Sequence, residues 1–297
     1  MPPAKKPTSV AIVTRTKDRP LLLQRAMRSV LQQEHQDWTH IIVNDGGDKD
    51  AVNALAKEMK KHYAGRLVVL HHATSKGREA ASNAGLKKCK DRYVVFLDDD
   101  DTWHPSFLRR CLGALQNSPV RGARGVACQT VRIEEILQSD GHTREIKRGL
   151  FNGWLRAVSI PRLCAQNYLP NLSLILEKSL IDEIGDFDED LHVLGDWDFN
   201  LRVALAAEIL VVPEALAYYH LRAEGRTSYS NSFYMYKDDL FKVSRAQVIN
   251  KWIRLERKKP TGFSVAQAMA FAELNAEGHY FSSRANRIFR ALSAWAE

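Results

Sequence analysis

The sequence predicts an α/β fold in which a Rossmann-like, mainly parallel sheet is flanked by helices and followed by a C-terminal helical extension. Two patterns lead to this prediction. In the first part of the chain, short apolar runs alternate with longer segments whose apolar residues recur at helical spacing. From Ser232 onward, long amphipathic patterns take over. Apolar strands that alternate with helices form parallel sheets whose two faces are both covered.

Four apolar runs in the first part of the chain are expected to be buried strands, because each is long enough for a strand and too short for a helix. They cover residues 10–13, 40–43, 67–70 and 93–97. Three helices are expected between these strands. The first begins near Asp18, and the other two cover 51–62 and 79–88. For the first helix, Asp18 is expected to be the N-cap and Pro20 a first-turn residue.

The second part of the chain is less regular. Helices are expected over residues 105–115, 180–184 and 197–207, and strands within 125–134 and over 172–176. Residues 139–142, Ser-Asp-Gly-His, are typical of a turn between two extended segments. We therefore expect two halves of one domain, residues 1–103 and 104–230, followed by the helical extension 231–297.

The composition is that of an ordinary globular protein. Of 297 residues, 45% are hydrophobic and 26% charged, which excludes disorder, collagen and coiled coil for the whole chain. The net charge of +8 suits an anionic partner, but the chain shows no nucleic-acid-binding module, so no nucleic acid is expected. The four cysteines are scattered without zinc spacing, and neither a signal peptide nor a membrane span is apparent. We therefore expect a cytoplasmic protein.

Polar segments follow three of the predicted strands, at residues 14–19, 44–47 and 98–101. They should meet at one edge of the sheet, because the carboxyl ends of parallel strands lie together and bind ligands there. The last segment is a run of four aspartates, Asp98 to Asp101. Side-chain alternation can turn Asp98 and Asp100 the same way, where their oxygens would suit Mg²⁺ or Mn²⁺. The alternative is an acidic loop that caps the helix near Pro105.

Other polar residues near these strand ends allow two interpretations each. Asp45 could accept a hydrogen bond from a nucleobase N–H or stabilise an Asx-turn. The cations could bind phosphate or form a solvated basic rim. These cations are Arg15, Lys17, Arg19, Lys76 and Arg78.

A second acidic segment, Gly195-Asp196-Trp197-Asp198, lies at the expected start of a helix. Asp196 could cap that helix, or it could be a general base that removes a proton from an acceptor hydroxyl. Trp197 could lie beside the reacting groups or be an ordinary core aromatic. His220, next to two tyrosines, could bind a metal or be a packed residue.

Six segments resemble, in order, the motifs of the family 2 glycosyltransferases, which have the GT-A fold. They are 16–20 (TKDRP, similar to T-x-N-R-P), 43–47 (VNDGG, V-D-D-G-S), 81–85 (ASNAG, A-R-N-x-G), 96–105 (L-D-x-D-D with Trp103 and Pro105), 183–189 (EIGDFDE, E-x-G-G-F-D-E) and 195–202 (GDWDFNLR, E-D-W-D-x-x-x-R). The similarity covers about residues 9–228. Six collinear motifs are a specific signal.

The resemblance implies a metal-assisted direct displacement that moves a sugar, with inversion, from a nucleotide-sugar to an acceptor hydroxyl. The donor, by default UDP-linked, would bind residues 1–103, and the acceptor would bind 104–230. Asp196 would be the catalytic base and Trp197 an acceptor contact, while Asp100, Asp98 and His220 would hold Mn²⁺ or Mg²⁺. The implied donor-binding residues are Thr16, Arg19, Asp45, Lys76, Arg78, Asn83, Asp98, Asp99, Arg222 and Arg226.

Two departures from the family pattern affect this implied site. Gly195 stands where the family often has Glu, so any help from that acid is absent, and Ser82 replaces the usual Arg. The Q-x-x-R-W signature of processive members is also missing. We therefore expect a single-addition enzyme acting on a carbohydrate or lipid-linked acceptor in bacterial cell-surface polysaccharide or glycoconjugate synthesis. The alternative is a non-catalytic nucleotide-sugar-binding or scaffold protein.

The extension 231–297 lies outside the resemblance. It combines apolar faces with an excess of Lys and Arg over Asp and Glu. Packing on the catalytic domain or on a second copy in a homodimer is expected. The alternative is that these helices rest peripherally on the inner membrane, where lipid-linked acceptors reside.

Overall fold

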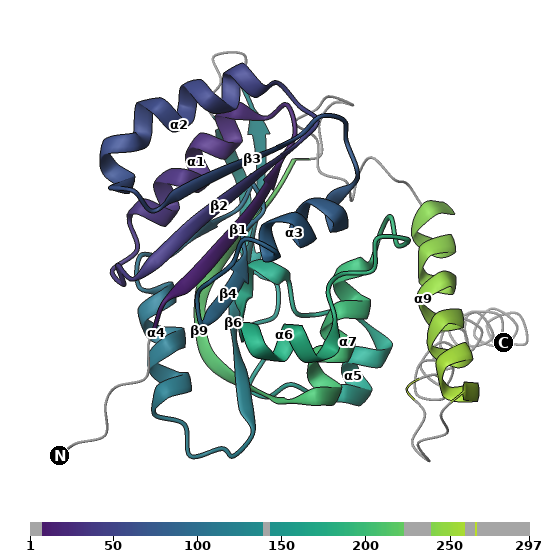
Figure 1. Ribbon diagram of the computed structural model, residues 1–297. Coiled ribbons are helices and arrows are strands. Elements are labelled where there is room, and N and C mark those ends of the chain that lie inside the picture. The colour runs from purple at the N-terminus through teal and green to yellow at the C-terminus, as the bar shows by residue number, and fades with distance from the viewer. Residues whose placement is uncertain (1–7, 139–142, 223–238, 259–264, 266–297) are drawn as a thin grey trace, which may run out of the picture.

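A curved sheet of nine strands runs through the centre of the molecule (Figure 1). The computed structural model describes residues 8–138, 143–222, 239–258 and 265. The sheet order is β3-β2-β1-β4-β8-β6-β9-β5, and β7 pairs with β6 off this path. The strands are β1 Val10–Thr16, β2 Trp38–Asp45, β3 Leu67–His72, β4 Tyr93–Phe96, β5 Thr102–Trp103, β6 Ala123–Leu137, β7 Thr143–Leu150, β8 Leu174–Glu177 and β9 Glu208–Leu221.

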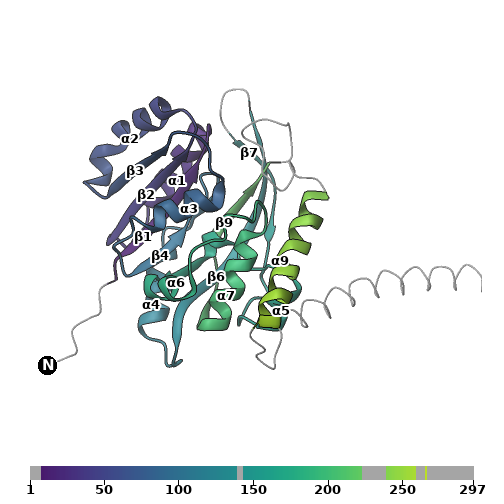
Figure 2. The ribbon, with the colours of Figure 1, turned by 45° about the vertical axis from the view of Figure 1, so that its right-hand side comes forward.

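Helices cover both faces of the sheet (Figures 1 and 2). They are α1 Pro20–Leu31, α2 Lys49–Tyr63, α3 Arg78–Leu86, α4 Phe107–Gln116, α5 Ile160–Ala165, α6 Lys178–Ile184, α7 Gly195–Ala206 and α9 Asp239–Lys258, with a 3-10 turn at Asn171–Ser173. One buried apolar cluster joins the sheet to α1, α2 and α4. The other joins it to α3, α5, α6, α7 and α9.

Strand β1 illustrates why the predicted strands are continuous apolar runs. Val10 and Ile12 belong to the cluster under α1 and α2, whereas Ala11 and Val13 face the cluster under α3. Both faces are buried, so no polar residue alternates with the apolar ones. β1 pairs in parallel with β2 and β4, and β2 pairs in parallel with β3. The predicted α/β class and the mainly parallel first part of the sheet are confirmed.

The second part of the sheet is mixed. β8 runs antiparallel to both β4 and β6, and β7 forms an antiparallel pair with β6 on either side of residues 139–142. The extended segments expected on both sides of that turn are therefore present, while the turn itself lies outside the described residues. The long strand β9 was not expected. It pairs in parallel with β6 through several register shifts, and such long-range pairing leaves no local periodic signal.

The start of α1 differs from the expectation. The N-cap is Arg19, not Asp18, and Pro20 is the first helical residue. Asp18 has a φ of 54°, and its Oδ1 accepts a hydrogen bond from the backbone N of Asp48 at 2.8 Å. Because its backbone is left-handed, the Asp18 side chain points away from the start of α1. It holds the loop before α2 instead.

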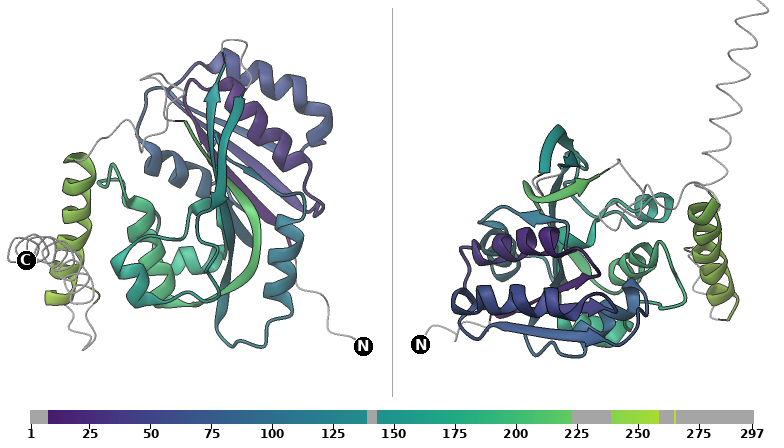
Figure 3. Two further views of the ribbon diagram at one scale, coloured as in Figure 1. Left: turned by 180° about the vertical axis from the view of Figure 1, so that it is seen from behind. Right: turned by 90° about the horizontal axis from the view of Figure 1, so that it is seen from above.

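Helix α9 is the described part of the C-terminal extension, and it lies alongside α5 and α7 (Figure 3). Val248 and Ile249 are buried in the apolar cluster that includes α7. Lys251 Nζ is 2.9 Å from Asp198 Oδ2, and Asp198 is 0% exposed. This part of the extension packs on the α/β domain, against α5 and α7. In the described ranges, no helix is both long enough and apolar enough to cross a bilayer.

Candidate active site

The side chains of the four aspartates after β4 fall into two groups, a cluster of three and Asp99 apart from it. Carboxylate oxygens of Asp98, Asp100 and Asp101 lie within 4.8 Å of one another. Asp99 instead accepts hydrogen bonds from Thr16 Oγ1 at 2.6 Å and Arg19 Nε at 3.1 Å. The sequence predicted that Asp98 and Asp100 come together; it missed Asp101, although the run of aspartates contained it. We call Asp98, Asp100 and Asp101 the acidic cluster.

Positive groups surround the acidic cluster. Arg15 binds Asp98 through two nitrogens, at 2.8 and 3.3 Å, and Arg222 Nη2 contacts Asp100 Oδ2 at 2.5 Å. Burial raises the pKa of Asp101 well above its usual value, and the neighbouring charges of Asp100 and Asp98 raise it further. Repulsion of this kind is relieved by a cation, and three clustered carboxylates are the hard oxygen donors that Mn²⁺ and Mg²⁺ bind. The acidic cluster therefore fits a divalent metal.

His220 does not belong to the acidic cluster among the residues that the structure describes. Its Nδ1 lies 2.9 Å from Glu135 Oε2 and its Nε2 lies 2.8 Å from Thr102 Oγ1. Burial lowers the pKa of His220, which keeps the ring neutral, although the hydrogen bond to Glu135 opposes this. His220 thus links strands β5, β6 and β9 behind the cluster, which favours the packed-residue alternative.

Glu135 is a site residue that the sequence did not reveal. It is buried on β6 and accepts from Arg25 at 2.8 Å and from Arg222 at 2.8 Å. Arg25 also donates to the backbone oxygen of Asp100. Glu135 therefore holds two arginines against Asp100. No motif marks Glu135, because its role arises only where α1, β6 and β9 meet.

Asp196 lies in the first turn of α7, at the helix start where the sequence placed it. Its Oδ2 accepts from Asn167 Nδ2 at 3.0 Å and its Oδ1 from the backbone N of Trp197 at 2.8 Å. Burial raises the pKa of Asp196 above its usual value, Arg78 and Arg15 oppose this, and the charge of Asp98 adds to it. A carboxylate with raised proton affinity suits a general base. Asn167, which orients it, was not expected from the sequence.

Trp197 is a core residue. Its side chain is 1% exposed, and its Nε1 donates to the backbone oxygen of Leu163 at 2.6 Å. The Arg245 guanidinium of α9 lies 4.9 Å from the centre of the ring. The structure therefore favours the core alternative over the acceptor contact that the resemblance implied, because no part of the ring is left to meet a substrate.

Asp45 holds the loop between β3 and α3. Its carboxylate accepts four hydrogen bonds, from His72 Nδ1, Ser75 Oγ and the backbone N atoms of Lys76 and Gly77, at 2.7 to 3.0 Å. A carboxylate has about four acceptor positions, so none is left for a nucleobase in this arrangement. The turn after β2 is held instead by Asn44, whose Oδ1 accepts from the backbone N of Gly47 at 3.1 Å.

Replacing Asp45 with Asn is expected to destabilise the protein by about 1–3 kcal/mol, because two of the four donors would face an amide NH₂ group. Urea unfolding with exposed Asp50→Asn as the control measures this. Burial raises the pKa of Asp45, but the Lys76 N–H and the other hydrogen bonds lower it below its usual value. Its stabilisation should therefore be lost as the pH falls through that lowered pKa. Unchanged stability with lost donor affinity would favour the nucleobase contact.

The remaining predicted donor residues differ in their placement. Lys76 is exposed on the loop that Asp45 holds, and Arg78 Nη2 donates to the backbone oxygen of His192 at 3.0 Å. Asn83 is buried and bonds both N and O of Phe187, at 3.0 and 2.9 Å, so it ties α3 to the loop before α7. Arg226 lies outside the described residues.

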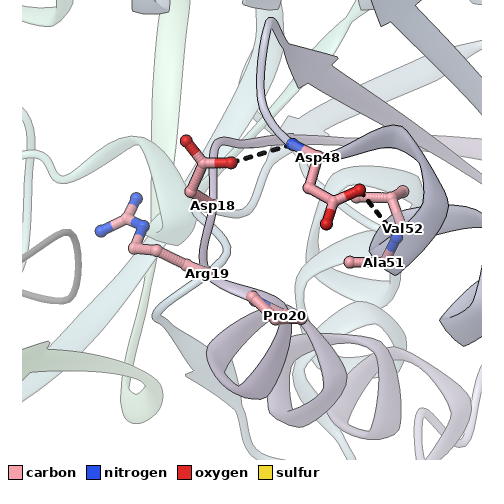
Figure 4. A pocket seen from close by; sticks show the side chains of 6 residues that line it. All are labelled: Asp18, Arg19, Pro20, Asp48, Ala51 and Val52. Atoms are coloured by element: carbon pink, nitrogen blue, oxygen red, sulfur yellow. Dashed lines mark hydrogen bonds between the residues drawn. The ribbon is translucent and has the colours of Figure 1, made fainter.

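A hollow of about 200 Å³ lies beside Arg19, between the starts of α1 and α2. It is lined by Asp18, Arg19, Pro20, Asp48, Ala51 and Val52. Figure 4 shows the Asp18–Asp48 hydrogen bond across it and the Arg19 guanidinium directed away from the other lining residues. The Arg19 guanidinium therefore points out of this hollow and forms ion pairs with Asp99 and Asp100.

Solved structures with this architecture are GT-A glycosyltransferases. The mannosyltransferase PcManGT from Pyrobaculum calidifontis, in complex with GDP-Man and Mn²⁺, superimposes with a TM-score of 0.61 at 16% identity, covering 92% of this chain and 71% of that one. S. aureus TarS 1–349 in complex with UDP-GlcNAc gives a TM-score of 0.58 at 18% identity, covering 82% and 66%. At such identities the likeness shows the fold, and the GT-A prediction is confirmed.

The chain belongs to glycosyl transferase family 2, whose sequence profile matches residues 9–157. The uncharacterized glycosyltransferase YwdF of Bacillus subtilis is 29% identical over 211 residues, 71% of this chain and 73% of YwdF. The pre-mycofactocin glycosyltransferase of Mycobacterium tuberculosis is 31% identical over 159 residues, 53% of this chain. The chain spans only 33% of that second relative.

Proposed function

We propose that this protein transfers a sugar from a nucleotide-sugar, UDP-linked by preference, to an acceptor hydroxyl with inversion at the anomeric carbon. One observation carries the proposal. Asp196, with raised proton affinity, lies close enough to the acidic cluster that Asp98 and Asp196 interact electrostatically. One site can therefore hold both a base for the acceptor and charged groups for the donor diphosphate.

In the proposed reaction, Asp196 takes the proton of the acceptor hydroxyl while the acceptor oxygen forms a bond to the anomeric carbon. The bond from that carbon to the diphosphate oxygen breaks, and its electron pair leaves with the nucleoside diphosphate. Attack from the face opposite the leaving group inverts the configuration. Asn167 holds the base through its 3.0 Å hydrogen bond.

The donor's negative charge would be met by residues at the other end of the site. A divalent cation held by Asp98, Asp100 and Asp101 would supply Lewis-acid stabilisation of the departing diphosphate. Arg19 and Arg222 already contact Asp100, and Lys76 lies exposed on the neighbouring loop. These cations can orient phosphate oxygens and balance charge as the leaving group departs.

We extend the proposal to the acceptor and the setting. A carbohydrate or lipid-linked hydroxyl in bacterial cell-surface polysaccharide or glycoconjugate synthesis is supported by bacterial relatives named as glycosyltransferases. The net charge of +8 suits a cytoplasmic enzyme that meets such acceptors at an anionic membrane surface. The amphipathic pattern of the C-terminal extension 231–297 supports a homodimer through these helices as the other proposal for a partner.

A thermal-shift screen tests donor binding. We expect UDP-sugars, with GDP-mannose as the comparison, to raise Tm only when Mn²⁺ or Mg²⁺ is present. A ligand at a hundred times its Kd stabilises the native state by about 2.7 kcal/mol, or roughly 5–10 °C for a protein of this size. A donor that shifts Tm but is never transferred to any acceptor would favour the non-catalytic alternative. The absence of any shift would contradict both.

A further inference from the structure

Gly195 opens a space that another residue fills. A Cβ atom added at Gly195 would lie 2.8 Å from both Cγ and Oε1 of Glu79. The backbone of Gly195 is not in the left-handed region, so glycine is needed there for space rather than for conformation. Glu79 lies in the first turn of α3 and is 7% exposed. A buried carboxylate from α3 thus occupies the place beside residue 195, where the family pattern has a glutamate.

The second departure from the pattern has a similar counterpart. Arg15 Nη1 lies 3.2 Å from the side-chain oxygen of Ser82, the position where the pattern has an arginine. The same nitrogen donates to the backbone oxygen of Arg78 at 3.4 Å, and Nε and Nη2 bind Asp98. A guanidinium from β1 therefore lies against the side chain at position 82.

The two substitute residues belong to one charged group. Arg15 Nη1 donates to the backbone oxygen of Arg78, the residue before Glu79, at 3.4 Å, and Arg78 Nη2 donates to the backbone oxygen of His192, three residues before Gly195, at 3.0 Å. Arg78 is a second cation that acts on both Glu79 and Asp196. Arg15 thus holds Asp98 on the donor side, while Arg78 and Glu79 of α3 meet the segment around Gly195 on the acceptor side.

We propose that Arg15 and Glu79 are positioning residues for the transfer reaction and replace the arginine and glutamate missing at positions 82 and 195. Arg15 holds Asp98 from beside the start of α3, and Glu79, resting on Gly195, supports the first turn of α7, in which Asp196 lies. This inference rests on the proposed function. It matters because transfer requires the donor carbon and the acceptor oxygen to align within a fraction of an ångström.

The experiment moves the carboxylate from position 79 to position 195. Glu79→Gln keeps the shape of the side chain, and Glu79→Ala removes it. Each is expected to lower kcat by about 10–100-fold, because a small displacement of Asp196 or Asp98 would misalign the reacting atoms. Donor Kd with Mn²⁺, measured by calorimetry, should change less than about threefold, because the acidic cluster is intact. Exposed Glu58→Gln on α2 is the matched control and should retain wild-type kcat.

The relocation variants complete the test. Gly195→Glu alone should lower both kcat and Tm, because two side chains then compete for one place. Glu79→Ala combined with Gly195→Glu should recover Tm and bring kcat to within about tenfold of wild type, a strongly non-additive outcome for residues in contact.

The outcomes separate this inference from the proposed function. If the wild type transfers sugar and Glu79→Gln keeps full kcat, the positioning role is wrong and the proposed function stands. If the double variant recovers Tm but not kcat, Glu79 only fills space, which also overturns the inference. If the wild type transfers sugar from no donor, the proposed function fails first, and the positioning role falls with it.

Discussion

Replacing Asp196 with Asn is expected to lower kcat by about 10²–10⁴-fold, the range by which a general base accelerates proton transfer. Asparagine has nearly the same shape and can accept from Asn167 through its one amide oxygen, so the side chain should stay in place, although its NH₂ group then faces the backbone N–H of Trp197. Donor Kd measured by calorimetry should stay within a few-fold of wild type, because Asp196 does not belong to the acidic cluster. Exposed Asp190→Asn is the control. Wild-type transfer by Asp196→Asn would remove the base assignment.

The stability of the same variant should depend less on pH than that of the wild type. Burial raises the pKa of Asp196 in the folded state, so the ionised form destabilises the fold as the pH rises from the unfolded pKa through the raised one. Above that pKa, removing the buried charge should return about 2–4 °C of Tm for each kcal/mol relieved, which offsets the cost of leaving the Trp197 N–H without its acceptor. The kcat of the wild type should fall as the pH drops through this raised pKa, and Asp196→Asn should lack that dependence.

Replacing Asp100 with Asn is expected to lower kcat/KM by about 10²–10³-fold, as loss of a main stabiliser of transition-state charge does. The variant should also lose the metal-dependent thermal shift with a nucleotide-sugar, since one of the three clustered carboxylates is gone. Chelation of divalent cations should bring the wild type down to a similar rate, and added Mn²⁺ should restore only the wild type. Asp50→Asn, exposed on α2, is the control.

Full transfer by the chelator-treated wild type would contradict the metal assignment. Arg19 and Arg222, which contact Asp100, would then be left to meet the diphosphate. Asp100→Asn would in that case still lower kcat/KM, because it removes the partner of both arginines, but without any change in metal dependence. The two measurements together separate a cation-binding cluster from an arginine-binding one.

The sequence predicted best where the signal is local. The strands that became β1 to β4 are short apolar runs bounded by helices, and the aspartates at the end of β4 follow directly from that strand. Asp196 was found because it lies in a recognisable motif at a helix start. These features depend on neighbours in the sequence, which periodicity and motifs report.

The features that were missed depend on contacts between distant segments. Glu135 reaches Arg222 across 87 positions of the chain, and Asn167 reaches Asp196 from the loop after α5, 29 positions earlier. The sequence predicted that Asp45 either bonds a nucleobase or stabilises its own turn, whereas the N–H donors that it accepts from lie about thirty positions away. Gly195 looked like a loss when viewed in one motif. The residue that accounts for it, Glu79, lies outside all six motifs.

Helix α9 has a practical consequence for anyone who wishes to shorten this chain. Among the residues that the structure describes, Lys251 and Arg202 form the two ion pairs of Asp198, at 2.9 and 3.1 Å. Asp198 is 0% exposed and lies two residues after Asp196. A chain that ends before residue 251 would lack Lys251. If it still contained α7, the buried Asp198 carboxylate would keep Arg202 alone of these two partners. A minimal active fragment should therefore extend through Lys258.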